Sequence, residues 1–177
     1  MRLIIAFCLI TLASCQNVSD NKPTFVDTKH FFEHEITILT EQKTGIEKYL
    51  NYGKKTDSLM MYDKVNWEKE LQAFTLIDLA KPSNRNTYIV DSSNYPNQTQ
   101  TNYTSTENKQ TLKKVKITKD IKSNIKVIEA ILTKTNSLYQ SYTNLRYVTD
   151  SGFSIYGKQS VKLGDESEYF INAKFIH

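Results

Sequence analysis

From Ile125 to Tyr147 the chain reads IKVIEAILTKTNSLYQSYTNLRY. The first part, Ile125 to Thr133, is β-branched and almost continuously apolar, whereas Ser137 to Tyr147 carries its large side chains at alternate positions. Both patterns are typical of β-strands, and Asn136-Ser137 supplies a turn between them. Because a connection this short joins antiparallel neighbours, we expect a hairpin within an antiparallel sheet.

Further strands are expected on both sides of this hairpin. Val115 and Ile117 alternate with lysines after Leu112, and the last strand shows one apolar face. That face consists of Tyr169, Ile171, Ala173 and Phe175. Weaker strand candidates are 86–90, 161–163 and a polar stretch around Tyr103. Short turns between these runs predict a meander of about six to seven strands.

The N-terminal half predicts two amphipathic helices instead. Between Thr28 and Leu50 the apolar residues Phe32, Ile36, Leu39, Ile46 and Leu50 form one stripe on a helix, with Gly53 at its end. In the second helix Asp63 is the expected N-cap, Trp67, Leu71, Phe74 and Leu79 form the stripe, and Lys81-Pro82 ends it. We therefore predict a single α+β domain over residues 28–177, in which two helices pack on one face of a curved antiparallel sheet.

The first 15 residues resemble the leader of the bacterial lipoprotein family. Arg2 precedes a short apolar run from Leu3 to Ala13, and Leu12-Ala13-Ser14-Cys15 matches the lipobox. The run is shorter than the about 20 residues of a membrane-spanning helix. The resemblance implies that residues 1–14 are a cleaved signal peptide, that Cys15 carries a diacylglyceryl group, and that residues 15–27 are a tether.

Cysteine use and the tether sequence extend this expectation. Cys8 leaves with the leader, so Cys15 remains as the single cysteine and no internal disulfide can form. Gln16 stands where an Asp would favour retention in the inner membrane. We expect an outer-membrane protein that faces the periplasm or the cell surface.

The charge balance excludes one class of partner. The chain has 23 Lys and Arg against 19 Asp and Glu, a formal net charge of +4. This balance is too even for a dedicated nucleic-acid binder. The expected partner is the membrane, reached through Cys15, and a further protein, lipid or glycan partner is left open.

One local motif could bind a metal. His30-Phe31-Phe32-Glu33-His34 spells H-x-x-E-H, in which two histidines one helical turn apart bind zinc and the glutamate activates water. A third protein ligand would be needed, and neither Glu41 nor Glu47 on the same predicted helix could reach back to supply it. We interpret these histidines as surface residues and predict no metal site, cofactor or catalytic residue.

Two further clusters have an ordinary structural explanation. Six lysines crowd the region after Leu112, and we interpret them as a solvated strand face. They are Lys113, Lys114, Lys116, Lys119, Lys122 and Lys126. Four tyrosines, Tyr139, Tyr147, Tyr156 and Tyr169, fit strands as good β formers, or line one sheet face that binds a glycan or an acyl chain.

A second resemblance spans most of the chain. The segment from Asn66 to Phe74, its continuation to Pro82, the strand with Tyr88, the Leu112–Lys119 strand and the hairpin at Asn136 are similar to a family of uncharacterised Bacteroidota lipoproteins. This resemblance implies the outer-membrane placement and the fold, and no catalytic residue. We expect a non-catalytic binding or structural lipoprotein; the alternative is a lipid or lipoprotein handler with an apolar cavity between sheet and helices.

Overall fold

The computed structural model describes residues 25–53, 55–84, 86–162 and 164–177. It is an antiparallel sheet of nine strands with one long helix, so the α+β class is confirmed and the predicted six to seven strands are too few. The helices are α1 (Thr28–Glu41) and α2 (Trp67–Glu70), followed by the 3-10 turns η1 (Phe74–Leu76) and η2 (Pro82–Asn84). The strands are β1 (Gly45–Tyr52), β2 (Lys55–Met61), β3 (Tyr88–Tyr95), β4 (Gln98–Ser105), β5 (Leu112–Asp120), β6 (Ile125–Thr135), β7 (Tyr139–Val148), β8 (Gly152–Val161) and β9 (Ser167–Ile176).

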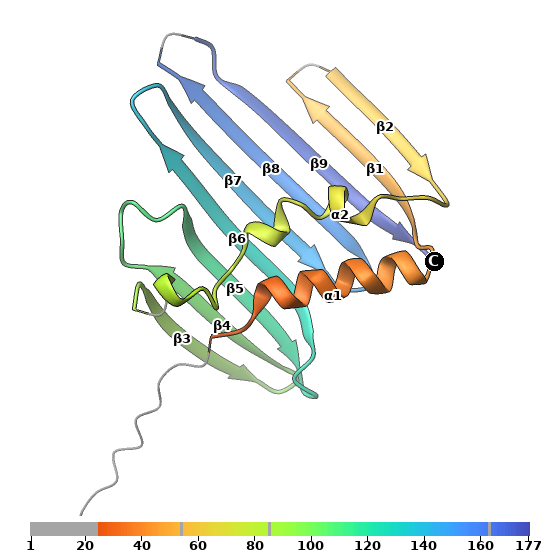
Figure 1. The fold of residues 1–177 in the computed structure, drawn as a ribbon, viewed down its shortest axis with the longest axis horizontal. Coiled ribbons are helices and arrows are strands. Elements are labelled where there is room, and N and C mark those ends of the chain that lie inside the picture. The colour runs from red at the N-terminus through yellow and green to blue at the C-terminus, as the bar shows by residue number, and fades with distance from the viewer. Residues whose placement is uncertain (1–24, 54, 85, 163) are drawn as a thin grey trace, which may run out of the picture.

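The strand order combines a meander with an added hairpin. Strands β3 to β9 lie side by side in chain order, as predicted, and the β1–β2 hairpin pairs with β9, giving the order β2-β1-β9-β8-β7-β6-β5-β4-β3. The two edge strands, β2 and β3, are therefore consecutive in the chain. The crossing segment, residues 62–84, carries the chain from the β2 side of the sheet toward the β3 side (Figure 1).

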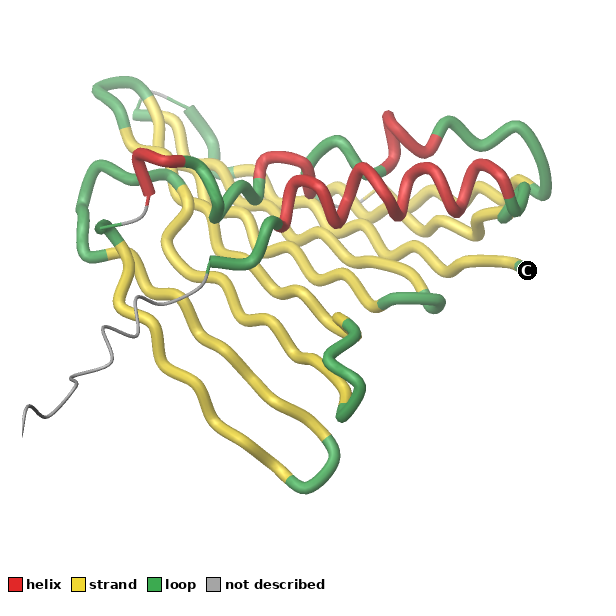
Figure 2. The backbone as a smooth tube through the Cα atoms, turned by 60° about the horizontal axis from the view of Figure 1, so that its bottom comes forward, coloured by secondary structure: helices red, strands yellow, loops and turns green. Residues whose placement is uncertain are grey.

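Helix α1 and the crossing segment form one layer over a single face of the sheet, which we call the helix face (Figures 1 and 2). Each contributes fully buried side chains, among them Phe32 from α1 and Trp67 from α2. The Trp67 indole lies edge-on to Phe175 of β9, with ring centroids 5.2 Å apart. The predicted packing of Trp67 against the last strand is confirmed.

Hydrogen bonds join the two parts of this layer. The Thr28 hydroxyl at the start of α1 donates to the carbonyl of Ile77 and accepts from the Leu79 amide at 3.2 Å. Thr28 is fully buried, so these bonds satisfy a polar group that burial would otherwise penalise. A half-buried ion pair between Lys48 of β1 and Glu70 of α2 also joins the sheet to the crossing segment, with Nζ 2.7 Å from Oε2.

The first predicted helix is too long. Helix α1 ends at Glu41, and Ile46 and Leu50 lie in strand β1, so Gly53 is in a turn between strands and does not end a helix. The sequence was ambiguous because a spacing of four residues matches both one helical turn and two strand repeats. Lys43, at φ 51°, and Gly45 are where the chain leaves the helical path.

The second predicted helix is wrong in form. Helix α2 has only four residues, and its N-cap is Asn66, whose side chain accepts from the Lys69 amide at 3.0 Å, whereas Asp63 lies outside the helix. On one continuous helix, at about 100° per residue, Ile77 and Leu79 would point about 160° apart. Both are fully buried, so the chain must break its helical path to place both in the core.

The predicted leader, Cys15 and all but the last three residues of the predicted tether lie outside the described residues. Phe25, near the end of that tether, packs on Tyr88 and Tyr103 with ring centroids 6.3 and 5.7 Å away. Within the described ranges no helix is long and apolar enough to cross a bilayer.

Candidate binding surface

The helix face of the sheet is closed by aromatic packing. Five rings from α1, η1 and three strands meet there, with neighbouring centroids 5.3 to 6.4 Å apart. They belong to Phe32, Phe74, Tyr147, Phe153 and Phe175. These rings fill the space in which a lipid-handling protein would hold an acyl chain, so such a ligand would have to displace them.

One carboxylic acid is buried among these rings. Glu35 of α1 is 8% exposed, and its Oε2 accepts a 2.5 Å hydrogen bond from the Tyr147 hydroxyl. Burial raises the pKa of Glu35, and the Tyr147 bond only partly offsets this effect. Burial and the neighbouring carboxylate raise the pKa of Tyr147 as well, so the phenol remains the donor. The pair fastens α1 to β7.

The opposite face of the sheet, which we call the open face, carries rings of its own. The strand registers place four aromatic residues on it in a diagonal line across β7, β8, β9 and β1. We call them the aromatic band: Tyr142, Tyr156, Phe170 and Tyr49. Phe170 is paired with Tyr156, whose ring centroid lies 6.2 Å from that of Tyr142. Phe170 and Tyr49 are 40% and 43% exposed, and Tyr142 and Tyr156 are half-buried.

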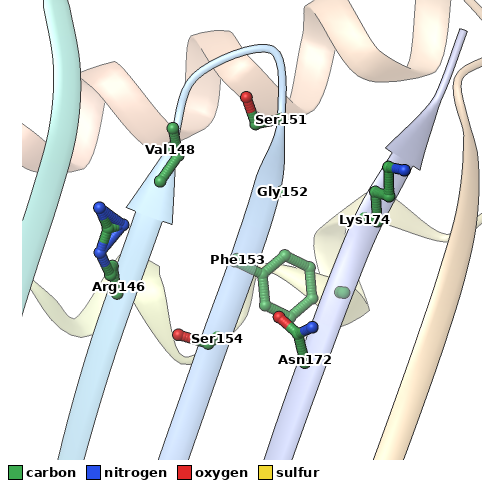
Figure 3. Close-up of a pocket in the computed structure, with 9 residues that line it drawn as sticks. Arg146, Val148, Ser151, Gly152, Phe153, Ser154, Asn172 and Lys174 are labelled. Carbon is green, nitrogen blue, oxygen red and sulfur yellow. The ribbon is translucent and has the colours of Figure 1, made fainter.

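A hollow of about 240 Å³ lies on the same face (Figure 3). It is next to the aromatic band, because its lining residue Asn172 is paired in register with Tyr49. Gly152 is one of the residues that line it, and the backbone of Ala173 in β9 comes so close that no side chain would fit at this position. Five polar or charged side chains surround this position, and we call the group the Gly152 cradle: Arg146, Ser151, Ser154, Asn172 and Lys174. Within the part of the chain that the structure describes, none of the five side chains donates or accepts a hydrogen bond, apart from the ion-pair contact of Arg146.

The charge of the cradle is positive. The Nε of Arg146 lies 3.7 Å from Oε1 of Glu129, and Lys116 makes a closer contact with the same carboxylate. One negative charge therefore serves two cations. Lys174 is paired in register with Glu47, but among the described residues it makes no ion pair within 4.0 Å. An anion placed here would meet two incompletely neutralised cations.

The H-x-x-E-H residues do not form a site. His30, Glu33 and His34 are all exposed on the outer side of α1, and Glu33 faces Lys29 at 3.8 Å. Across the described residues no group of three or more His, Cys, Asp or Glu side chains is arranged to hold a metal ion.

The six lysines after Leu112 are divided among local contacts. Lys113 donates to the carbonyls of Glu107 and Asn108, and Lys126 lies 3.8 Å from Asp120. With Lys116 on Glu129, half of the cluster is engaged within the sheet and its loops. Four of the six lysines lie in β5, whereas Lys122 is in the turn after it and Lys126 is in β6. The interpretation of a single solvated strand face is therefore only partly right.

The four tyrosines do not share one sheet face. Tyr139, Tyr147 and Tyr169 occupy helix-face positions, and Tyr147 is fully buried. Tyr156 lies on the open face, where it is part of the aromatic band and packs on Tyr142. The alternative of one tyrosine-lined face is therefore wrong, because it combined positions that alternate between the two faces of the sheet.

Comparison of the chain with protein-family models, with curated proteins and with solved structures gave no match. The resemblance to Bacteroidota lipoproteins stays a prediction. The functional argument consequently rests on the two surfaces described above.

Proposed function

We propose that the protein is a lipid-anchored bacterial lipoprotein of the outer membrane that acts as a non-catalytic binding module. The observation that carries the proposal is the aromatic band, which gathers four rings on the face of the sheet that none of the described helices covers. Exposed apolar patches of this kind mark binding surfaces. The side chains beside it are those that hold a ligand: an amide, two hydroxyls and two cations.

The anchor part of the proposal rests on the lipobox. Acyl chains on Cys15 would bind the protein to the bilayer at about 0.8 kcal/mol per buried CH₂. The net charge of +4 is too small to hold it there by itself.

The variant Cys15→Ser tests the anchor. We expect the wild-type chain in the membrane pellet and the variant mostly in the soluble fraction, because Cys15 is the sole predicted acylation site. Cys8→Ser is the matched control and should fractionate like wild type. Equal pelleting of the Cys15 variant and wild type would reject the lipoprotein assignment.

Native mass spectrometry distinguishes the binding module from the lipid-handling alternative. The binding module predicts a mass equal to that of the lipidated polypeptide, because rings fill the space between α1 and the sheet. A further, non-covalently bound lipid released by activation would favour the handler and contradict the proposal.

A further inference from the structure

We propose that the Gly152 cradle and the aromatic band together bind an acidic oligosaccharide. A sugar carboxylate would lie in the cradle, and the adjoining sugar rings would lie against the band. This inference rests on the proposed function, because it takes the open face as the contact surface and names the ligand class.

The cradle fits a carboxylate by charge and by shape. Arg146 and Lys174 stand on β7 and β9, on either side of Gly152 in β8, so that two strand spacings of about 4.8 Å separate their backbones. In the structure the Arg146 guanidinium turns toward Glu129 of β6, and the Lys174 ammonium points away from Gly152 (Figure 3). Both side chains are long and exposed, so each can turn toward a carboxylate placed over Gly152. There the guanidinium can donate a two-pronged hydrogen bond and the ammonium a charged one. The hollow of about 240 Å³ is below the about 300 Å³ typical of pockets for drug-sized molecules, so it suits one small acidic group.

The aromatic band fits the rest of such a ligand. Its rings stand on four neighbouring strands and extend over about three strand spacings, or about 14 Å. The negative face of an aromatic ring attracts the weakly positive C–H groups on the flat side of a sugar. Asn172 and Ser154, between the band and Gly152, offer an amide and a hydroxyl to the sugar hydroxyl groups. A ligand that uses both surfaces must be longer than a single ion.

Isothermal titration of the full mature chain in a non-ionic detergent tests the proposal. The probes are trigalacturonate, uncharged maltotriose, inorganic phosphate and a short single-stranded DNA. We expect trigalacturonate to bind at least about tenfold more tightly than each of the others, because it alone offers both a carboxylate and sugar faces. Equal binding of maltotriose would overturn the role of the cradle. If phosphate or DNA bound as tightly as trigalacturonate, the claim that the ligand is an oligosaccharide would be overturned.

Three variants locate the site. Arg146→Gln and Lys174→Gln should each weaken trigalacturonate binding about tenfold, as expected when a charged hydrogen-bond partner is removed, and Phe170→Ala should weaken it by a similar factor. Lys134→Gln is the matched control: it removes the same charge from an exposed residue on the opposite face of the sheet and should leave binding unchanged. All four residues are exposed, so each variant should keep the melting temperature of wild type, and a loss of binding would not reflect unfolding. A loss with Lys134→Gln equal to that with Arg146→Gln would reject the site.

The two proposals fail separately. If Cys15→Ser releases the chain from membranes but trigalacturonate does not bind, the sugar is wrong and the anchored module stands. If trigalacturonate binds but membrane pelleting does not depend on Cys15, the anchor is wrong and the site stands.

Discussion

Glu35 is the one acid in the described chain that is buried by the aromatic core, and this placement makes stability depend on pH. Burial holds its pKa above the ordinary value near 4.5, so the folded protein binds this proton more tightly than the unfolded chain does. The contribution of Glu35 to the free energy of unfolding is therefore largest below that ordinary value. It falls as the pH rises toward the pKa of the folded state.

Glu35→Gln tests this dependence. Glutamine keeps an oxygen that accepts the Tyr147 hydrogen bond but cannot ionise. As the pH rises above about 4.5, the free energy of unfolding should therefore fall less for the variant than for wild type. Urea unfolding at several pH values measures the difference. Glu33→Gln, at an exposed position of the same helix, should retain the wild-type slope. Parallel slopes for wild type and Glu35→Gln would show that Glu35 does not titrate in this window.

At the scale of single elements, the N-cap of α2 is not the residue that the sequence predicted. Asn66 caps the helix in the structure, whereas the sequence favoured Asp63. Asn66→Ala should lower the free energy of unfolding by about 1 kcal/mol, the usual cost of a lost N-cap. Asp63→Ala should change it by less than about 0.5 kcal/mol, as for ordinary surface positions. A larger cost at Asp63 would show that the helix starts earlier.

The elements that the sequence predicted well are those with one buried face. Strands β6, β7 and β9 alternate or run apolar because their helix-face side chains enter the core. Strand β2 was not recognised because nearly all of its residues are exposed, so that burial imposes no alternation on them. Strand β1 was assigned to a helix because Ile46 and Leu50 satisfy both periods.

The candidate surface was harder to predict than the fold. Phe170, Asn172 and Lys174 occupy the positions that alternate with the apolar face of β9, and Asn172 and Lys174 make that side of the strand look like an ordinary polar surface. Their relation to Arg146 and Tyr49 depends on the registers of three strand pairs. The pairing of β1 with β9 joins segments that are more than 100 residues apart, and no local pattern encodes it.

At the scale of the whole molecule, the same pairing governs folding. Residues 45–52 pair with 169–176, so the sheet is complete only when segments more than 100 residues apart meet. Such non-local contacts require loop closure before they contribute any stability, which slows folding.

Trp67 makes this step observable. It is the single tryptophan, and it packs against Phe175 of β9, so its fluorescence reports docking of α2 on the last strand. After dilution from urea, we expect the Trp67 signal to recover in about milliseconds to seconds, the range of sheet proteins. Far-ultraviolet circular dichroism should recover at the same rate if the domain folds as one unit. A recovery within microseconds would contradict the role given to the β1–β9 pairing.

The course of the crossing segment gives the sheet a mechanical property. Nine strands have eight spacings of about 4.8 Å, so the edges lie about 38 Å apart along the sheet. The crossing segment, residues 62–84, runs along this width. Five of its side chains are fully buried against the sheet: Trp67, Leu71, Phe74, Ile77 and Leu79. The sheet cannot flatten or curl further without pulling these side chains out of the core. These buried contacts therefore oppose changes in the curvature of the sheet and hold the open face in one shape. The proposed ligand would not have to supply the free energy to order this face.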